Sequence, residues 1–124
     1  MKDFRDLEVW TQAHQLTLRV YKVTGSFPRE ELFGLTSQMR RCSASVAANI
    51  AEGCGTKGNA EFHRFLLVSS GSASELEYHL LLAHDLGYIR PPEHERLTIQ
   101  LSRMRKMLAA LIRKVENDRL AAKC

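Results

Sequence analysis

The sequence has little of several residue types that mark specialised proteins. Its 124 residues include three cysteines, three prolines and one tryptophan. Cys42, Cys54 and Cys124 cannot all pair, and no Cys-x-x-Cys motif is present, which argues against a disulfide framework and against a redox site. We interpret the three as reduced thiols, with Cys42 acting as a small buried hydrophobic residue and Cys124 exposed.

The sequence also lacks a long apolar run. No window approaches the roughly 18–20 apolar residues that are needed to cross a bilayer. Charged residues interrupt the first ten positions, so no apolar signal core is present there. We therefore expect a cytoplasmic protein that does not enter a membrane.

What is present is the composition of an ordinary globular protein. The hydrophobic fraction is 44% and the charged fraction is 26%, which are typical values. A chain of this length fits one domain and buries about two thirds of its unfolded surface. We predict a single domain over residues 1–124.

Proline and glycine fall in clusters that divide the chain. All three prolines and six of the seven glycines lie within residues 25–34, 53–58 and 87–92. These residue types break helices, and no segment between the clusters shows the strict alternation of a half-buried strand. Short connections between helices favour an all-α, antiparallel up-down-up-down four-helix bundle. The predicted helices cover about residues 6–24, 35–52, 59–86 and 92–118.

The third segment contains a run, Ser69–Ser74, with the composition of a flexible linker. Apolar and small residues nevertheless keep one heptad phase through it, so we predict a continuous helix. Asn59 is the predicted N-cap, and Gly87 is the predicted left-handed residue after the last turn. Gly71 costs the helix about 1 kcal/mol relative to alanine, and we interpret it as the site of a close helix crossing. The residues in phase are Phe62, Leu66, Ser69, Ala73, Leu76, Leu80 and Ala83.

The other three segments carry similar seams. Two adjacent stripes on the first segment suggest that it contacts more than one neighbour. The first stripe comprises Val9, Ala13, Leu16, Val20, Val23 and Phe27, and the second comprises Leu7, Trp10, His14 and Tyr21. The seam of the second segment comprises Leu35, Met39, Cys42, Val46 and Asn49. The seam of the fourth comprises Leu97, Leu101, Met104, Leu108, Leu111 and Val115.

The sequence lacks the common motifs of catalytic and metal sites. There is no Gly-x-Ser-x-Gly elbow, and the glycine-rich residues 53–58 are better explained as a turn between helices than as a phosphate loop. A di-iron bundle needs Glu-x-x-His pairs. Here Glu75 and His79 are four residues apart and His84 lies five further on, which leaves one two-ligand face that we interpret as a solvated ion pair. We expect no enzymatic activity, no cofactor and no bound metal.

Positive charge is concentrated near the end of the chain. Residues 94–124 contain eight Lys or Arg and three Asp or Glu, a net charge of +5, whereas residues 59–93 carry −3. A row of cations can bind a phosphate backbone, although simple solvation is the competing explanation. The candidate residues are the Arg40-Arg41 pair and a band on the fourth helix formed by Arg96, Arg103, Lys106, Arg113 and Lys114.

Two polar residues stand near the end of the second segment. Asn49 falls on the apolar phase, where an unpaired amide would cost about 1–3 kcal/mol, and Glu52 follows it. Asn49 either contacts a bound partner or is a satisfied polar group that fixes the helix register. We favour the structural interpretation.

Several short motifs occur in an order and at a spacing that resemble one known family. They are FRDLEVW at residues 4–10, FGLTSQ at 33–38, NIAEG at 49–53, FHRFL at 62–66 and AHDLGY at 83–88. Together they resemble the four-helix bundle family encoded by intervening sequences of bacterial large-subunit rRNA. Many relatives have proline where this chain has Ala47. Alanine restores the backbone N–H, so a bend inferred from those relatives does not carry over.

The resemblance implies a cytosolic four-helix bundle that assembles as a homo-pentamer. A distantly similar group serves as the accessory protein of diversity-generating retroelements, which binds a reverse transcriptase and nucleic acid. The leading hypothesis is a non-enzymatic homo-oligomeric scaffold that binds RNA or DNA non-specifically through its basic face, with or without a protein partner. The alternative is a structural or protein-interaction oligomer with no nucleic-acid role. A metal-dependent bundle enzyme is the weakest hypothesis.

Overall fold

The computed structural model describes residues 3–122, and over this range the chain is helical with no strand. Two short 3₁₀ turns, η1 (Phe4–Asp6) and η2 (Arg29–Glu31), accompany four long helices. No helix in the described range is long and apolar enough to cross a membrane. The long helices are α1 (Glu8–Thr24), α2 (Leu35–Cys54), α3 (Asn59–Asp85) and α4 (Pro91–Ala121).

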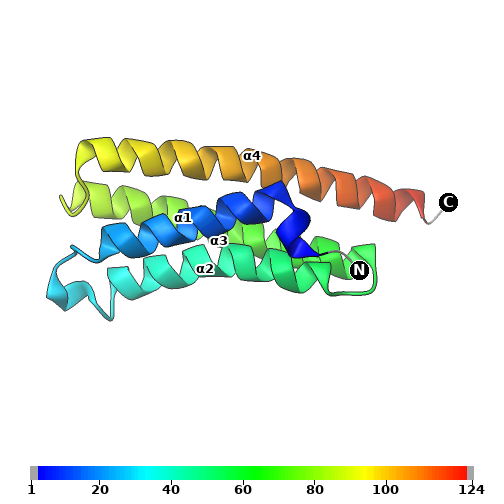
Figure 1. Ribbon diagram of the computed structural model, residues 1–124, viewed down its shortest axis with the longest axis horizontal. Coiled ribbons are helices and arrows are strands. Elements are labelled where there is room, and N and C mark those ends of the chain that lie inside the picture. Colours follow the sequence, from blue (N-terminus) through cyan, green and yellow to red (C-terminus); the bar gives the residue numbers. More distant parts are fainter. Residues whose placement is uncertain (1–2, 123–124) are drawn as a thin grey trace.

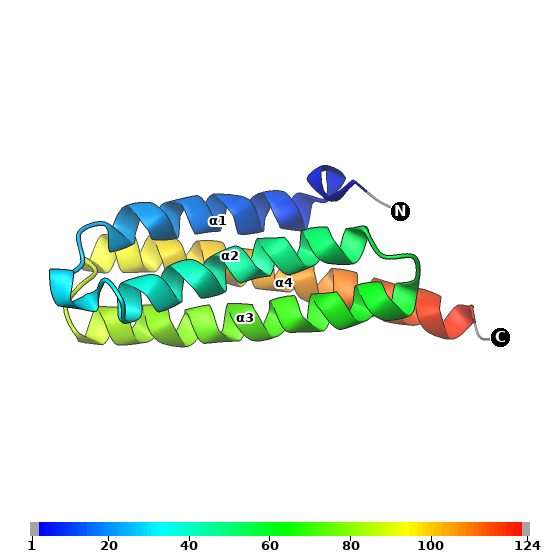
Figure 2. The ribbon, with the colours of Figure 1, turned by 90° about the horizontal axis from the view of Figure 1, so that it is seen from below.

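The four helices form an antiparallel up-down-up-down bundle, which confirms the predicted fold class (Figure 1). Each helix packs against the one before it, and α4 returns beside α1 to close the ring. Over the described residues, the diagonal pairs α1–α3 and α2–α4 make no backbone approach. Figure 2 shows that the C-terminal end of α4 continues beyond the start of α1. The last part of α4 therefore has no part of α1 beside it.

The predicted seams form the core. Every member of the α3 seam is buried, including the serine inside the linker-like run, so α3 is continuous as predicted. Leu111 of the α4 seam and Val23 of the α1 seam are only partly buried, and the remaining members of those two seams are buried. On α2 the core position is taken by Ile50, which is fully buried, while Asn49 beside it is half-buried.

The helix ends follow local rules. Asp3 caps η1 by accepting the Arg5 backbone N–H at 2.9 Å, and α1 begins only after this turn. Gly87 has φ of 78°, as predicted, and the N–H of Tyr88 donates to the carbonyl of Ala83 at 2.9 Å, which is the Schellman arrangement. Asn59 is the first residue of α3 and not its N-cap, because Gly58 occupies the cap position.

The predicted close crossing at Gly71 is wrong. Gly71 lies on the exposed outer face of α3, and a methyl group there would meet no atom within 4 Å. The close approach is instead at Gly53, where a methyl group would lie 2.9 Å from Cδ1 of Phe62 and 3.0 Å from Cβ of Phe65. Heptad phase identifies which residues share a helix face, but it does not show which face another helix covers.

The small residues of α2 let hydroxyl groups reach backbone carbonyls between helices. Thr17 of α1 donates to the carbonyl of Ser43 at 3.1 Å, and Ser69 of α3 donates to the carbonyl of Val46 at 2.5 Å. Both hydroxyls are buried and each has an acceptor. Burial without an acceptor would cost each of them about 1–3 kcal/mol. These bonds therefore fix α1 and α3 against α2.

The second stripe of α1 is occupied largely by the chain itself. The ring of Phe4 packs 4.8 Å from that of Trp10, and Trp10 stacks on His14 at 5.0 Å. Tyr21 lies beneath the guanidinium of Arg40, 4.8 Å from the ring centre. The side chains of this stripe thus contact residues of the same chain, and the stripe gives little support to an interface with another copy.

Candidate functional site

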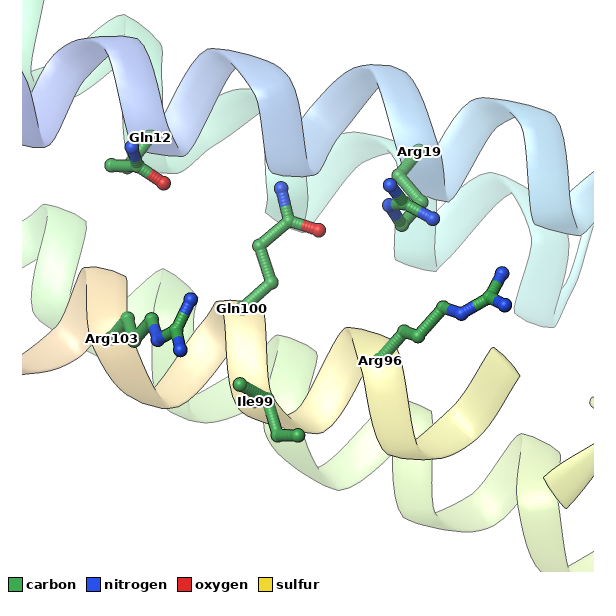
Figure 3. Close-up of a pocket in the computed structure, with 6 residues that line it drawn as sticks. All are labelled: Gln12, Arg19, Arg96, Ile99, Gln100 and Arg103. Atoms are coloured by element: carbon green, nitrogen blue, oxygen red, sulfur yellow. The ribbon is translucent and has the colours of Figure 1, made fainter. Parts of the chain in front are cut away.

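A groove runs along the outside of the bundle between α1 and α4. It contains two adjoining hollows of about 340 and 350 Å³. In Figure 3, Gln100 lies between two ends, with Gln12 and Arg103 at one and Arg19 and Arg96 at the other. The lining residues are Gln12, Gln15, Leu18, Arg19, Lys22, Arg96, Ile99, Gln100 and Arg103.

The groove is cationic. Arg19 and Lys22 come from α1, and Arg96 and Arg103 come from α4. None of the described residues that line the two hollows is an Asp or Glu. Figure 3 shows the Arg103 and Arg96 side chains on α4, with Arg19 opposite Arg96 on α1. Four cations from two helices thus surround one concave surface.

One carboxylate organises one end of the groove. Glu93 lies 3.4 Å from Nη1 of Arg19 through Oε1 and 3.5 Å from Nη1 of Arg96 through Oε2. Its side chain is 26% exposed, while those of Arg19 and Arg96 are 41% and 69% exposed. Glu93 therefore joins the two arginines across the seam but offsets only one of the four charges of the groove.

The predicted band on α4 is partly in this groove. Arg96 and Arg103 line it, whereas Lys106, Arg113 and Lys114 are exposed further along the helix. Gln12 lines the same hollow as Arg103, and at 1.5 Å per residue Arg113 and Lys114 fall beyond the start of α1. Lys114 is also paired with Asp118 at 3.2 Å.

Arg40 and Arg41 lie outside the groove and differ from each other. Nε of Arg40 donates to Oγ1 of Thr24 at 2.9 Å, and Nη2 donates to the carbonyl of Tyr21 at 3.2 Å. Arg40 is therefore held in place between α1 and α2. Arg41 is exposed on the outer side of α2.

Sequence reasoning missed the contribution of α1 to the groove. Gln12, Gln15, Arg19 and Lys22 follow steps of three and four and form one polar stripe on α1. That spacing was available in the sequence. What was missing was the knowledge that this stripe faces the cations of α4, because the facing depends on the register of two helices far apart in the chain.

A second group of polar side chains lies between α2 and α3. Nε2 of His79 is 3.1 Å from Oε2 of Glu75, so the expected pair forms. It is not the solvated pair that was predicted, because His79 is buried against α2 and only Glu75 is exposed. Cys42 of α2 joins this pair, so that one donor atom from each of the three residues lies within 4.8 Å of the others. Cys42 and His79 are buried and Glu75 is exposed. His84 is not part of the group; its Nδ1 lies 3.0 Å from Oδ1 of Asp85.

Comparison with known proteins decides the family. Residues 5–110 match the family described as 23S rRNA-intervening sequence protein. The chain belongs to this family. A crystal structure of a protein of unknown function from the S23 ribosomal protein family of Bacteroides thetaiotaomicron VPI-5482 shares the fold, with a TM-score of 0.78 and 24% sequence identity, covering 85% of this chain and 95% of that chain. No curated protein matches the chain.

The two polar residues near the end of α2 have different surroundings in this 23S rRNA-intervening sequence protein. Nδ2 of Asn49 donates to the carbonyl of Ser45 at 2.8 Å and to its hydroxyl at 2.9 Å. The Ser45 hydroxyl in turn lies 2.8 Å from that of Ser72 on α3. Asn49 thus belongs to a polar link between α2 and α3, as its structural interpretation requires, whereas Glu52 is exposed.

Burial makes Cys42 a poor nucleophile. Desolvation, followed by the nearby Glu75 carboxylate, raises the pKa of Cys42 to about 12. The thiol therefore stays protonated as the pH rises through 8, and little of the reactive thiolate forms. We expect iodoacetamide at pH 8, with chelator present, to leave Cys42 unmodified in folded protein and to alkylate it in urea. Peptide mass mapping checks this, and rapid modification in folded protein would contradict it. Cys124 lies outside the described residues.

Proposed function

We propose that this chain is a non-enzymatic, homo-oligomeric helical scaffold that binds RNA or DNA non-specifically through the groove between α1 and α4. The observation that supports the proposal most directly is the convergence of four cations from two helices on one concave surface, where a single carboxylate, Glu93, pairs with two of them. Scattered solvating charges have no reason to converge in this way. We further propose a reducing, cytoplasmic location, which fits the buried free thiol of Cys42.

The chemistry of the groove suits phosphate more than bases. Arginine guanidinium groups bind phosphate oxygens in a planar, two-pronged geometry, and each neutralised phosphate releases condensed counterions. No aromatic residue is among the described residues that line the hollows, so base stacking is absent from them. Contacts of this kind position a backbone without reading its sequence.

We predict that the affinity depends strongly on salt. Replacing Arg19, Arg96 and Arg103 by Gln should reduce the slope of log affinity against log salt by about 2.7 for duplex DNA and about 2.1 for single strands, from 0.9 or 0.7 per phosphate contact. Fluorescence anisotropy with labelled RNA and DNA across a salt series measures the slope.

A matched variant controls for net charge. Arg5, Arg29 and Arg64 are replaced by Gln in the same way; Arg5 and Arg64 lie on other parts of the bundle, paired with Asp3 and Glu61. In this variant, the slope of log affinity against log salt should stay close to that of wild type. Equal losses in the two variants would show a diffuse charge effect, and no binding by wild type at about 50 mM salt would leave the alternative, an oligomer with no nucleic-acid role.

The proposed oligomer rests on a different surface. Phe33 is 93% exposed, although it stands on an ordered turn. Glu31 in that turn accepts the Tyr88 hydroxyl through Oε2 at 3.0 Å and the Leu35 N–H through Oε1 at 3.3 Å. A large aromatic side chain held in water by a fixed backbone favours contact with a partner.

A second copy of the chain offers a matching hollow. A depression of about 430 Å³ lies between α3 and α4, and Tyr78, Leu81 and Leu101 contribute to its lining. Tyr78 and Leu81 are 58% and 51% exposed. We propose that Phe33 of one copy enters this hollow on the next. Because the two surfaces differ, the contact is head-to-tail and can close into a ring. The number five comes from the family resemblance.

A further inference from the structure

The group formed by Cys42, Glu75 and His79 is separate from the groove and from the proposed oligomer contact. Its donor atoms are a thiol sulfur, a carboxylate oxygen and an imidazole nitrogen, all within 4.8 Å of one another. Two of the residues lie one turn apart on α3, and the third comes from α2. The packing of two helices therefore brings together three groups that can each donate an electron pair to a cation.

His79 is incompletely satisfied within the protein. Its side chain is only 10% exposed, and its Nε2 contacts Oε2 of Glu75 at 3.1 Å. Its Nδ1 is the one buried side-chain nitrogen or oxygen atom among the described residues that has no hydrogen-bond partner. Changing the tautomer does not remove the problem, because Nδ1 is either an acceptor without a donor or a donor without an acceptor. Buried polar groups in folded proteins normally have a partner.

No lysine or arginine of the described range forms an ion pair with Glu75. Among the described residues, the recorded ion-pair partner of Glu75 is His79, and Cys42 makes one weak contact, from Sγ to the carbonyl of Met39 at 3.5 Å. Glu75 is 55% exposed, so the group has a path to solvent on one side. A cation arriving along that path would meet three donor atoms.

We propose that Cys42, Glu75 and His79 form a binding site for a zinc ion. One sulfur, one nitrogen and one oxygen ligand are a combination that zinc accepts, and three protein ligands leave a fourth position for water. Binding replaces the thiol proton of Cys42 with the metal and releases that proton to solvent. The expectation of no metal was based on α3 alone, where only two ligands were visible. The third ligand is on another helix.

The geometry needs a small adjustment. Zinc–sulfur and zinc–nitrogen distances of about 2.3 and 2.0 Å at a tetrahedral angle place the ligand atoms about 3.5 Å apart. The donor atoms here are within 4.8 Å. Nε2 of His79 and Oε2 of Glu75 are already 3.1 Å apart, so the remaining adjustment brings these two atoms and Sγ of Cys42 closer together.

Zinc binding is tested with the full chain in a Cys124→Ser background, so that the remaining thiols are Cys42 and Cys54. After treatment with chelator and its removal, titration with zinc chloride in a calorimeter should give one site per chain. Cys42→Ala, His79→Gln and Glu75→Gln should each weaken binding at least tenfold. Cobalt(II) added in place of zinc should give a sulfur–cobalt charge-transfer band that Cys42→Ala abolishes.

Two matched variants serve as controls. Cys54→Ala removes the other buried cysteine, and His84→Gln removes another histidine of α3; neither residue belongs to the group, and both variants should bind zinc like the background protein. Circular dichroism reports folding. If Cys42→Ala or His79→Gln does not fold, the test depends on Glu75→Gln, because residue 75 is exposed and its substitution should not affect folding. No binding at about 100 μM zinc, or binding unchanged in Glu75→Gln and in the folded members of the set, would overturn the proposal.

Discussion

Replacing Gly53 with valine should lower the free energy of unfolding by about 2–3 kcal/mol, because extra methyl groups in a packed interface force neighbouring side chains and backbone to move. The first added carbon would lie 2.9 Å from Cδ1 of Phe62 and 3.0 Å from Cβ of Phe65. Phe62 is 5% exposed and cannot swing into solvent without leaving the core. Urea unfolding followed by circular dichroism gives the free energy.

Gly71→Ala is the matched substitution in the next helix. Gly71 lies in the middle of α3 with open space around it, so alanine should raise the free energy of unfolding by up to about 1 kcal/mol through helix propensity alone. The two changes therefore have opposite expected signs. A neutral Gly53→Val would show that α2 and α3 are not in close contact there, and a destabilising Gly71→Ala would show that another surface covers this face of α3.

Phe33→Glu should convert the oligomer into monomers. Wild type is expected near 70 kDa for five chains, and the variant near the mass of one chain, 14.1 kDa. A carboxylate at position 33 would have to lose its water to enter the hollow of the neighbouring copy, where it would lie among leucines and near the like charge of Glu77. The change should not affect the fold, since Phe33 is 93% exposed. Light scattering coupled to size exclusion measures the mass.

The other side of the same contact gives an independent check. Leu81→Glu alters the hollow itself and should also yield monomers, whereas Leu120→Glu, near the far end of α4, should leave the mass unchanged. A wild-type monomer at micromolar concentration would refute the oligomer. An oligomer that persists in both Phe33→Glu and Leu81→Glu would place its interface elsewhere. Neither result bears on the zinc titration.

Local sequence signals predicted most of the fold. The heptad phase through Ser69–Ser74 identified α3 correctly against its composition, because burial depends on phase and not on the flexibility of individual residues. Gly87 was predicted correctly as the left-handed residue after α3, because glycine is favoured where a helix ends in a left-handed turn. The family motifs identified the bundle as well, and their match over residues 5–110 confirms it.

Features that depend on two helices were predicted less well. Gly71 was assigned to a crossing because glycine in a helix suggests close approach, but the helix that comes close does so at Gly53. Arg105 does not belong to the predicted band on α4, and its partners across the α3–α4 interface, Glu77 at 2.7 Å and Ser74 at 2.8 Å, became visible only in the fold. The position of Cys42 beside His79 likewise depends on how α2 packs against α3. The spacing of residues along the sequence does not show how far one helix is shifted along its axis relative to another.

The axial register of the helices also affects where the cations of the groove lie. The Thr17 and Ser69 hydroxyls bind carbonyls three residues apart on α2, from opposite neighbours. The Thr17 hydroxyl shares its proton between the Ala13 carbonyl of its own helix at 2.8 Å and the Ser43 carbonyl of α2 at 3.1 Å. A slide of α1 by one turn, about 5.4 Å, would break the contact with Ser43 and would move Arg19, two residues further along the same helix. The axial position of the α1 cations is thus coupled to a contact inside the bundle that no ligand in the groove would touch. Removing the Thr17 hydroxyl would remove this contact while leaving every charged residue in place.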